Sequence, residues 1–335
     1  MSLNEKITIA DIAAHAQVSK STVSRVLNET TPVAADKREA VLAAMAALNY
    51  KPNVFAQSLA SGQSLSIGVL TQNFGSPVYD VIMRGVLLGL EETPYSPLFA
   101  DGRWQPETEQ KAIETFLDRR VDGLILIGGY CPEEVLVETA RRTPLIIVGR
   151  EVPGLHNHCL NVDNEQGAYA ITRYLIDLGH QDIAHITGIL AHEDAAQRLQ
   201  GYRQALLDVG IEPHPDLVIE GNFRRQSGMM ATEMLLLRGR PFSAIFCAND
   251  QMAFGARLAL YRRGIRVPDD VSLVGFDDQP DSAFMTPPLT TIRQPAEEMG
   301  RMAAMAVLQL IKGGSPDLPL FQTELVIRES VSRHH

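Results

Sequence analysis

The sequence predicts a small all-α domain followed by two α/β lobes with parallel sheets. Residues 1–50 show apolar residues at helical spacing and no strand pattern. From Ser66 onward, short valine, isoleucine and leucine runs alternate with amphipathic helical patterns, which is typical of parallel sheets covered by helices on both faces. Two such series follow one another, which indicates two similar lobes. A length of 335 residues with 45% hydrophobic content fits two or three domains with cores of their own.

The stretch SKSTVSRVLN at residues 19–28 predicts a short helix that is polar on one side. Ser19 is a favourable N-cap, and Val23, Val26 and Leu27 lie at helical spacing on one face. The opposite face carries side chains that can reach phosphates or base edges of DNA. These side chains are Lys20, Ser21, Ser24, Arg25 and Asn28.

A second short helix precedes this one. Thr8 can cap a helix with apolar residues at Ile9 and Ile12, and Gln17 and Val18 remain as the connection. Two short helices joined by a tight turn, the second capped and polar outside, form the helix-turn-helix pattern. The alternative is a small helical hairpin that only packs on a larger domain. A third helix over 35–48 completes a domain that we expect at 1–50.

Residues 51–64 are expected to form a hinge helix and linker. Pro52 breaks the third helix, because proline disfavours the helical conformation in the residue before it. Asn53 can cap a segment at 54–60 that is too short to be stable alone. This segment therefore needs a partner, either a second subunit or DNA.

Residues 65–331 are expected to form the two lobes, an effector-binding and dimerisation domain. We place the N-lobe at about 65–162 and 294–324, and the C-lobe at about 163–292 and 325–331. A ligand would sit between the lobes at the strand ends. Strands are predicted at 67–71, 97–100, 123–127, 145–149, near 161, and at 183–187, 218–220, 244–247, 272–276, 290–295 and 322–331. Helices are predicted at 81–92, 107–119, 133–141, 166–178, 195–209, 227–237, 251–263 and up to about 311.

The net charge is −10, and its distribution is asymmetric. Residues 1–63 carry six basic and five acidic side chains, a net charge of +1, so the rest carries −11. Non-specific DNA affinity should therefore be modest, and specific contacts with dimer avidity must supply the remainder. No apolar run of about 18 residues and no export signal is apparent, which favours a cytoplasmic protein without a membrane span. The three cysteines lack metal spacing and read as reduced core thiols.

No catalytic pattern is found. Phosphate-binding glycine loops, the G-x-S-x-G, H-E-x-x-H and C-x-x-C motifs are absent from the sequence. His156 and His158 stand two residues apart but have no third ligand nearby, so they read as surface residues. We expect no enzyme activity, no catalytic or metal site, and no cofactor.

Long phrases of the chain resemble the LacI/GalR family of transcriptional regulators over nearly its whole length. TIADIAAHAQVSKSTVSRVLN resembles the DNA-binding signature, and AMAALNYKPNVFAQSLA resembles the third helix and hinge. VDGLIL, LGHQDIAHITG, RLQGYRQAL, CANDQMAFGA, VPDDVSLVGFDD and PPLTTIRQP follow in the family's order. The resemblance implies periplasmic-binding-protein-like lobes on a helix-turn-helix head. It also implies a sequence-specific DNA-binding transcriptional repressor controlled by a small-molecule effector.

The resemblance also implies the residues that contact DNA. The family's major-groove readers fall on Lys20, Ser21 and Arg25, and arginine can pair with guanine through two hydrogen bonds. Thr22, Ser24 and Asn28 match positions that hold the phosphate backbone or the helix. Leu59 matches the hinge residue that enters the minor groove at the operator centre, where it kinks the DNA. The alternative for Leu59 is an ordinary core leucine.

The family's ligand contacts fall on Arg198, Asn249 and Asp277, with Phe223 at the position of an aromatic that stacks on the ligand. A fork of donors, a pair of acceptors and an amide suit adjacent sugar hydroxyls. Asn73, Phe74 and Arg150 are weaker candidates from the facing lobe. For each, a purely structural ion pair or cap is the alternative. The implied effector is a mono- or disaccharide.

Two positions depart from the family pattern. Gln17 stands where many members have glycine in the turn, and Ala34 replaces the usual hydroxyl cap of the third helix. The family's tetramer-forming tail is absent, so we expect a homodimer on double-stranded palindromic operator DNA. Whether the effector induces or corepresses, and whether the regulator represses or activates, stays open. Rival hypotheses are a purine or other metabolite as corepressor, a sugar-binding transport protein, and an enzyme.

Overall fold

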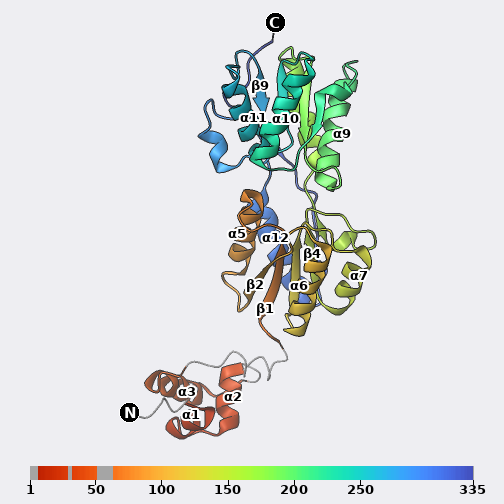
Figure 1. Cartoon of the computed structure of the whole chain (residues 1–335). Helices are drawn as coiled ribbons and strands as arrows, with labels where there is room; N and C mark the ends of the chain where they lie inside the picture. Colours follow the sequence, from red (N-terminus) through yellow and green to blue (C-terminus); the bar gives the residue numbers. More distant parts are fainter. Residues whose placement is uncertain (1–6, 29–31, 51–62, 335) are drawn as a thin grey trace.

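The computed structural model describes residues 7–28, 32–50 and 63–334 (Figure 1). The head consists of α1 (Ile9–His15), α2 (Lys20–Asn28) and α3 (Ala35–Ala47). Its core is formed by Ile12, Val23 and Val41, none of which is exposed to solvent. Each helix contributes one of these residues, so the three helices form a domain with its own core.

Local polar contacts fix the starts of α1 and α2. The backbone N–H and the hydroxyl of Thr8 both donate to the Asp11 carboxylate, at 2.8 and 2.7 Å. The hydroxyl oxygen of Ser19 accepts from the N–H of Thr22 at 3.2 Å, which confirms Ser19 as the cap of α2. Gln17 is left-handed with φ 53°, and Ala34 makes no side-chain cap. Both departures noted in the sequence are therefore real weaknesses of the head.

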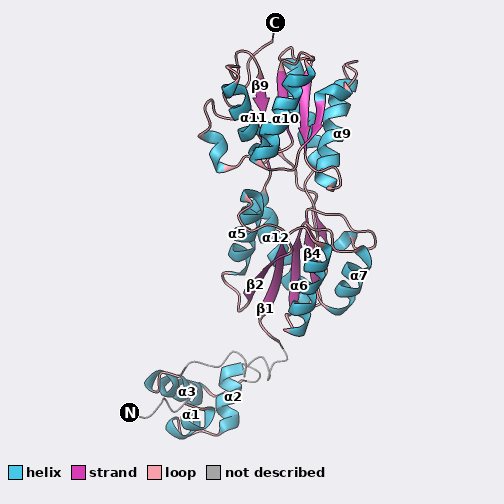
Figure 2. Cartoon of the chain, viewed as in Figure 1, coloured by secondary structure: helices cyan, strands magenta, loops and turns pink. Residues whose placement is uncertain are grey.

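The first lobe is built on a parallel sheet, five-stranded in the described part, in the order β2-β1-β3-β4-β5. Helices cover both faces of this sheet (Figure 2). Its strands are β1 (Ser66–Thr71), β2 (Ser96–Asp101), β3 (Gly123–Ile127), β4 (Leu145–Val148) and β5 (Cys159–Leu160). Its helices are α5 (Pro77–Leu90), α6 (Pro106–Asp118) and α7 (Glu133–Arg142).

The second lobe repeats this plan around the order β7-β6-β8-β9. A short antiparallel pair, β10 (Thr291–Arg293) and β11 (Glu324–Val326), lies beyond its edge. The strands are β6 (Ile183–Thr187), β7 (Val218–Glu220), β8 (Ala244–Cys247) and β9 (Ser272–Val274). The helices are α8 (Asn164–Asp177), α9 (Glu193–Leu207), α10 (Arg225–Arg238) and α11 (Asp250–Arg262).

The chain returns to the first lobe through α12 (Ala296–Ile311), which packs along α5. The two helices approach so closely that only glycine fits at the contact. A Cβ added to Gly85 would overlap the carbonyl of Glu297, and a Cβ on Gly300 would overlap that of Ile82. Reciprocal glycines, Gly228 and Gly255, join α10 to α11 in the same way. These pairs lock neighbouring helices at a fixed distance.

The predicted fold class is confirmed, and the differences lie at the element ends. Helix α5 begins at Pro77, four residues before the predicted start at 81, because a proline in the first turn lacks only an N–H that has no helical partner there. Strand β9 ends at Val274, two residues early, and the strand expected near Asn161 lies at 159–160. The hinge segment 54–60, with Leu59, lies outside the described residues. Among the residues that are described, no helix combines the length and hydrophobicity needed to cross a membrane.

Candidate functional site

The outer face of α2 presents a row of polar side chains. Lys20, Ser21 and Arg25 are exposed, while Val23 and Val26 on the opposite face are buried. Thr22 and Ser24 are half-buried, and the Thr22 hydroxyl shares a 2.9 Å hydrogen bond with that of Ser19. The three predicted groove-reading side chains therefore point away from the head, as a DNA-reading face requires. Asn28 is the last residue of α2, and its side chain lies outside the description.

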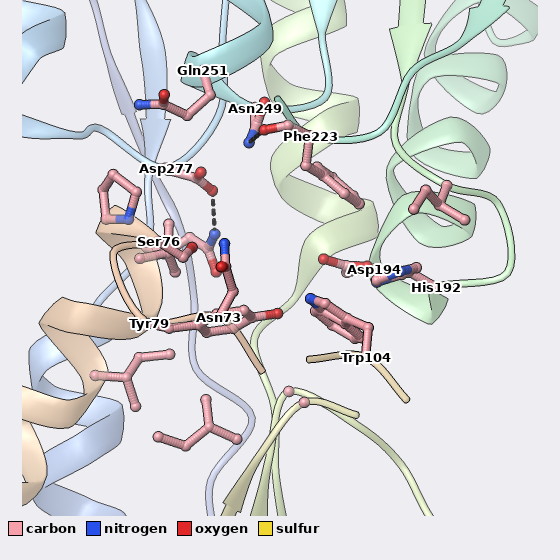
Figure 3. Close-up of a pocket in the computed structure, with 18 of the residues that line it drawn as sticks. Asn73, Ser76, Tyr79, Trp104, His192, Asp194, Phe223, Asn249, Gln251 and Asp277 are labelled. Carbon is pink, nitrogen blue, oxygen red and sulfur yellow. Dashed lines mark hydrogen bonds between the residues drawn. The ribbon is translucent and has the colours of Figure 1, made fainter. Parts of the chain in front are cut away.

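A cavity of about 710 Å³ lies between the lobes, at the carboxyl ends of both sets of strands. Loops from the first lobe form one wall, and loops from the second lobe form the other (Figure 3). The cavity brings together Asn73, Arg198, Phe223, Asn249 and Asp277. These five were named from the sequence, and each follows or lies near the end of a strand.

Arg198 belongs to the part of the cavity wall that the second lobe provides, and it is 3% exposed. Its guanidinium donates to Asn164 Oδ1 at 2.9 Å and to the Ala248 carbonyl at 2.5 Å, and it lies 3.8 Å above the Phe276 ring. Its Nη1 is 3.8 Å from a carboxylate oxygen of Asp277. The arginine is thus held from several sides, with one edge directed toward the cavity carboxylate.

The side chain of Asp277 is buried beside this arginine, and the residue adopts an unusual backbone with φ 114°. Its carboxylate accepts from the amide groups of Gln294 at 2.6 Å and Gln279 at 3.1 Å. Burial raises the pKa of Asp277, and the Arg198 guanidinium opposes that shift. A strained, hydrogen-bonded carboxylate in a cavity is the kind of group that ligand sites maintain.

Asp250 stabilises the segment that follows Asp277 in the cavity wall. It is fully buried and accepts from the backbone of Gln279 and the hydroxyls of Ser282 and Thr291, at 2.8, 2.7 and 2.6 Å. Burial raises the pKa of Asp250, and the neighbouring Asp277 carboxylate raises it further. Three donors satisfy this group, so it holds the loops and leaves Asp277 to face a ligand.

Asn249 and Phe223 are coupled to each other. The Asn249 side chain caps α11 by accepting from the N–H of Met252 at 2.9 Å, and it donates to the Phe223 carbonyl at 3.0 Å. Phe223 is left-handed with φ 62°, and its ring lies directly against Gly188. The amide therefore has a structural role in addition to any contact with a ligand.

Two of the weaker candidates do not line the cavity. Phe74 is 51% exposed and lies outside the lining residues, although its neighbour Asn73 is among them. Arg150 donates to the carbonyls of Gly129 and Cys131 at 3.2 and 2.7 Å, behind the wall. Arg150 therefore has a structural role in these contacts, because its hydrogen bonds hold the loop that follows β3.

The structure adds lining residues that sequence reasoning missed. Besides amide side chains and the arginines Arg103, Arg224 and Arg225, they include aromatic and acidic residues that follow β1, β2, β3 and β6, where parallel strands end. That position was the available signal, since carboxyl ends of strands share one edge of a sheet. The aromatic and acidic members are Tyr79, Trp104, Tyr130, His192 and Asp194.

The arrangement suits a ligand rich in hydroxyl groups. Carboxylates accept hydrogen bonds, the guanidinium donates them, and amides do both, while the aromatic rings cover apolar faces. His156 contacts the Glu151 carboxylate away from the cavity. Within residues 7–28, 32–50 and 63–334, no three histidine, cysteine or acidic side chains gather as metal ligands do.

Comparisons with known proteins cover the head, the lobes and nearly the whole chain. Residues 8–53 match the model described as bacterial regulatory proteins, lacI family, and 172–331 match a periplasmic binding protein-like domain. The chain is 34% identical to the ribose operon repressor of Haemophilus influenzae over 97% of this chain and 98% of that protein. It is also 34% identical to the repressor PurR of Pasteurella multocida, with coverage of 97% and 98%. The structure of the Lac repressor dimer bound to operator and the anti-inducer ONPF superposes with a TM-score of 0.88, 34% identity and coverage of 98% and 100%.

Proposed function

Because the chain belongs to the LacI family of bacterial regulatory proteins, we propose that it represses transcription as a dimer on a two-fold operator and releases the DNA when a sugar binds. One observation carries the sugar-sensing part. Polar side chains from both lobes, Asn73 from the first and Arg198, Asn249 and Asp277 from the second, converge on one cavity. A ligand that contacts both lobes can bias their relative orientation.

The DNA-binding part rests on the exposed face of α2. Arg25 can pair with guanine, while Lys20 and Ser21 choose among bases less rigidly. We propose that Thr22, Ser24 and Asn28 position the helix on the backbone, and that Leu59 of the hinge enters the minor groove. The Lac repressor neighbour is a dimer on its operator, which supports a dimer here. Two-fold symmetry then predicts two similar half-sites.

A sugar is favoured over a purine by the chemistry of the cavity wall. Arg198 and the carboxylates of Asp194 and Asp277 offer donors and acceptors around a ligand's edge, which adjacent hydroxyls can satisfy together. The relative named a ribose operon repressor supports this choice. The PurR relatives keep a purine corepressor as the second candidate. All these relatives are repressors, which supports a protein that binds its ligand without transforming it.

The path from cavity to DNA runs through the first lobe. Helix α5 begins at the cavity wall, where Ser76, Pro77 and Tyr79 are lining residues, and it is locked to α12. We propose that sugar binding rotates the lobes and changes the spacing of the paired hinge segments at 54–60. Allosteric coupling of about 1 to 3 kcal/mol changes DNA affinity roughly 5-fold to 150-fold, enough for regulation.

A binding experiment tests this function directly. The full chain is first used to select a palindromic site from random DNA, and binding to that site is then titrated with sugars and with purines. We expect salt-sensitive, sequence-specific binding that a sugar weakens. Absence of sequence-specific binding under every condition would contradict the regulatory role, and weakening or strengthening by a purine alone would replace the sugar.

Asp277→Ala tests the cavity assignment. The variant should bind the operator but lose at least about tenfold in sugar affinity, because a buried acceptor of sugar hydroxyls is removed. Asp269→Ala is the matched control, since Asp269 carries an exposed carboxylate outside the cavity. Normal sugar-induced release by the Asp277→Ala protein would exclude this carboxylate from ligand recognition.

A further inference from the structure

The cavity has a second aromatic wall that faces Phe223 from the other lobe. The indole of Trp104 projects from the first lobe, and the Phe223 ring projects from the second, with His192 and Asp194 at one side between them (Figure 3). The centroid of the His192 ring is 4.2 Å from that of Trp104 and 5.6 Å from that of Phe223. The two outer rings are therefore at most about 10 Å apart. Both rings line the same cavity of about 710 Å³, which has room for one saturated six-membered ring.

Trp104 is held in place by a strained backbone and a buried polar frame. Arg103 and Trp104 are consecutive left-handed residues, with φ 55° and 57°. The N–H of Trp104 donates to the side-chain oxygen of Gln72, which is buried, at 3.1 Å. Strain of this kind persists only where surrounding contacts enforce it, and it clusters at ligand sites.

The neighbouring loop completes the frame. The buried Glu109 carboxylate accepts from the backbone N–H groups of Tyr130 and Cys131, at 2.9 and 2.7 Å. This places the Tyr130 ring 5.3 Å from Trp104, while the absence of a side chain at Gly128 leaves room for the indole. The indole is thus supported from beneath, and it presents a preformed apolar surface to the cavity.

The edge between the two aromatic rings is polar. The Asp194 carboxylate lies 3.8 Å from Arg198, and a third of this side chain is exposed. Asp277 and Asn249 lie on the Phe223 side, and Asn73 faces them from the first lobe (Figure 3). A ring placed between Trp104 and Phe223 would therefore meet apolar groups above and below and hydrogen-bonding groups around its rim.

We propose that Trp104 and Phe223 sandwich a pyranose ring, and that the cavity consequently selects sugars of the gluco configuration. This inference rests on the proposed sugar-sensing function. In a β-glucopyranose every substituent is equatorial, so both faces of the ring expose only C–H groups and all hydroxyls point to the rim. Inverting C4 gives the galacto configuration, with an axial hydroxyl on one face. Pressed against an aromatic ring, that hydroxyl loses water without gaining a hydrogen-bond partner.

The experiment compares C4 epimers on the full-length protein. The probes are D-glucose, methyl β-D-glucopyranoside and cellobiose against D-galactose, methyl β-D-galactopyranoside and lactose, with hypoxanthine as the purine. Affinity is measured by calorimetry, and Trp104 is the single tryptophan, so fluorescence reports on the same site. We expect the tightest gluco probe to bind at least about tenfold more tightly than its C4 epimer.

Two variants distinguish loss of the aromatic surface of Trp104 from loss of folding. Trp104→Ala should lower the affinity for the gluco probe about tenfold or more and reduce the preference between epimers to about threefold or less. Trp104→Phe keeps an aromatic face and should retain most of the preference. Unchanged unfolding temperature and operator binding without sugar show that each variant is folded.

The outcomes are distinct. Equal or tighter binding of the galacto epimers, or unchanged gluco affinity in a folded Trp104→Ala protein, overturns the sandwich and leaves sugar sensing intact. Binding of hypoxanthine without binding of any sugar overturns the proposed function itself. Absence of binding by every probe overturns the gluco preference, and therefore the inference, and leaves sugar sensing to other sugars. A C4 preference that Trp104→Ala abolishes and Trp104→Phe retains supports the inference.

Discussion

Gly188→Ala should convert the protein into a repressor that responds poorly to its effector. Gly188 directly follows β6, and a Cβ added there would lie less than 2.5 Å from three atoms of the Phe223 ring. Ordinary contact begins at about 3.4 Å, so the ring must move by about 1 Å or more, away from Gly188 and into the cavity. Overpacking of this size costs about 1 to 3 kcal/mol.

The displaced ring occupies space that the ligand needs, so effector affinity should fall roughly tenfold to hundredfold, which corresponds to about 1.4 to 2.8 kcal/mol. Operator affinity without effector should stay within about twofold, because Gly188 is remote from α2 in the chain and lies in the C-lobe. Denaturant unfolding measures the stability cost, calorimetry measures sugar affinity, and gel shift measures operator release.

A double-mutant cycle tests the assigned cause. In a Phe223→Ala background the obstructing ring is gone, so Gly188→Ala should cost less than about 0.5 kcal/mol. The coupling energy between the two positions should then account for most of the loss seen in the single variant. An equal loss of stability with and without the Phe223 ring would refute the reasoning and assign the effect to the backbone of residue 188.

Three further predictions concern other parts of the chain. Gln17→Gly should stabilise the head by about 1 kcal/mol, because glycine tolerates φ 53°. The measurement is a higher unfolding temperature, and the control Gln17→Ala should not raise it. Burial lowers the pKa of His185 to about 4, below an unfolded value of about 6.5, so stability is complete above pH 6.5 and falls as the pH drops toward 4. Urea unfolding at several pH values should show this loss, up to about 3 kcal/mol, and His185→Phe should remove that part of the pH dependence. Glu109→Gln should lower the unfolding free energy by about 1 to 3 kcal/mol, because the backbone N–H groups of Tyr130 and Cys131 lose a charged acceptor. The same change should shift the fluorescence of Trp104. An unchanged emission spectrum would argue against a role of Glu109 in holding the loop that carries Tyr130 and Cys131.

Much of the fold follows from local pattern. Buried parallel strands are continuous apolar runs, and β1, β3, β4 and β6 begin within one residue of the predicted positions. The C-lobe side of the cavity was also predictable, because Arg198, Asn249 and Asp277 lie in phrases shared with the family. The starts of helices were harder to predict. Helix α5 begins at Pro77, directly after Ser76, whereas the apolar spacing in the sequence indicates a start further along the chain.

The N-lobe wall of the cavity could not be predicted in the same way. Phe74 and Trp104 are both aromatic residues shortly after a strand, yet only Trp104 lines the cavity. The difference arises from the left-handed backbone at Arg103 and Trp104 and from the distant Gln72 that fixes it. Arg150 is likewise held against the loop that follows β3, because the backbone carbonyls of Gly129 and Cys131, about twenty residues away in the chain, accept its hydrogen bonds. Such tertiary contacts leave no periodic trace in the sequence.

The reciprocal glycines between α5 and α12 and between α10 and α11 limit which residues of the protein can change in evolution. Helices held backbone to backbone cannot slide past one another. We therefore expect each helix pair to move as a unit, and the response to a ligand to be transmitted by rotation rather than by repacking. The loops that recognise the ligand are separate from these contacts. We therefore expect that side chains such as Trp104 can be exchanged to bind a different effector while the contacts between these helices stay intact. The glycines should be the positions at which no such exchange is tolerated.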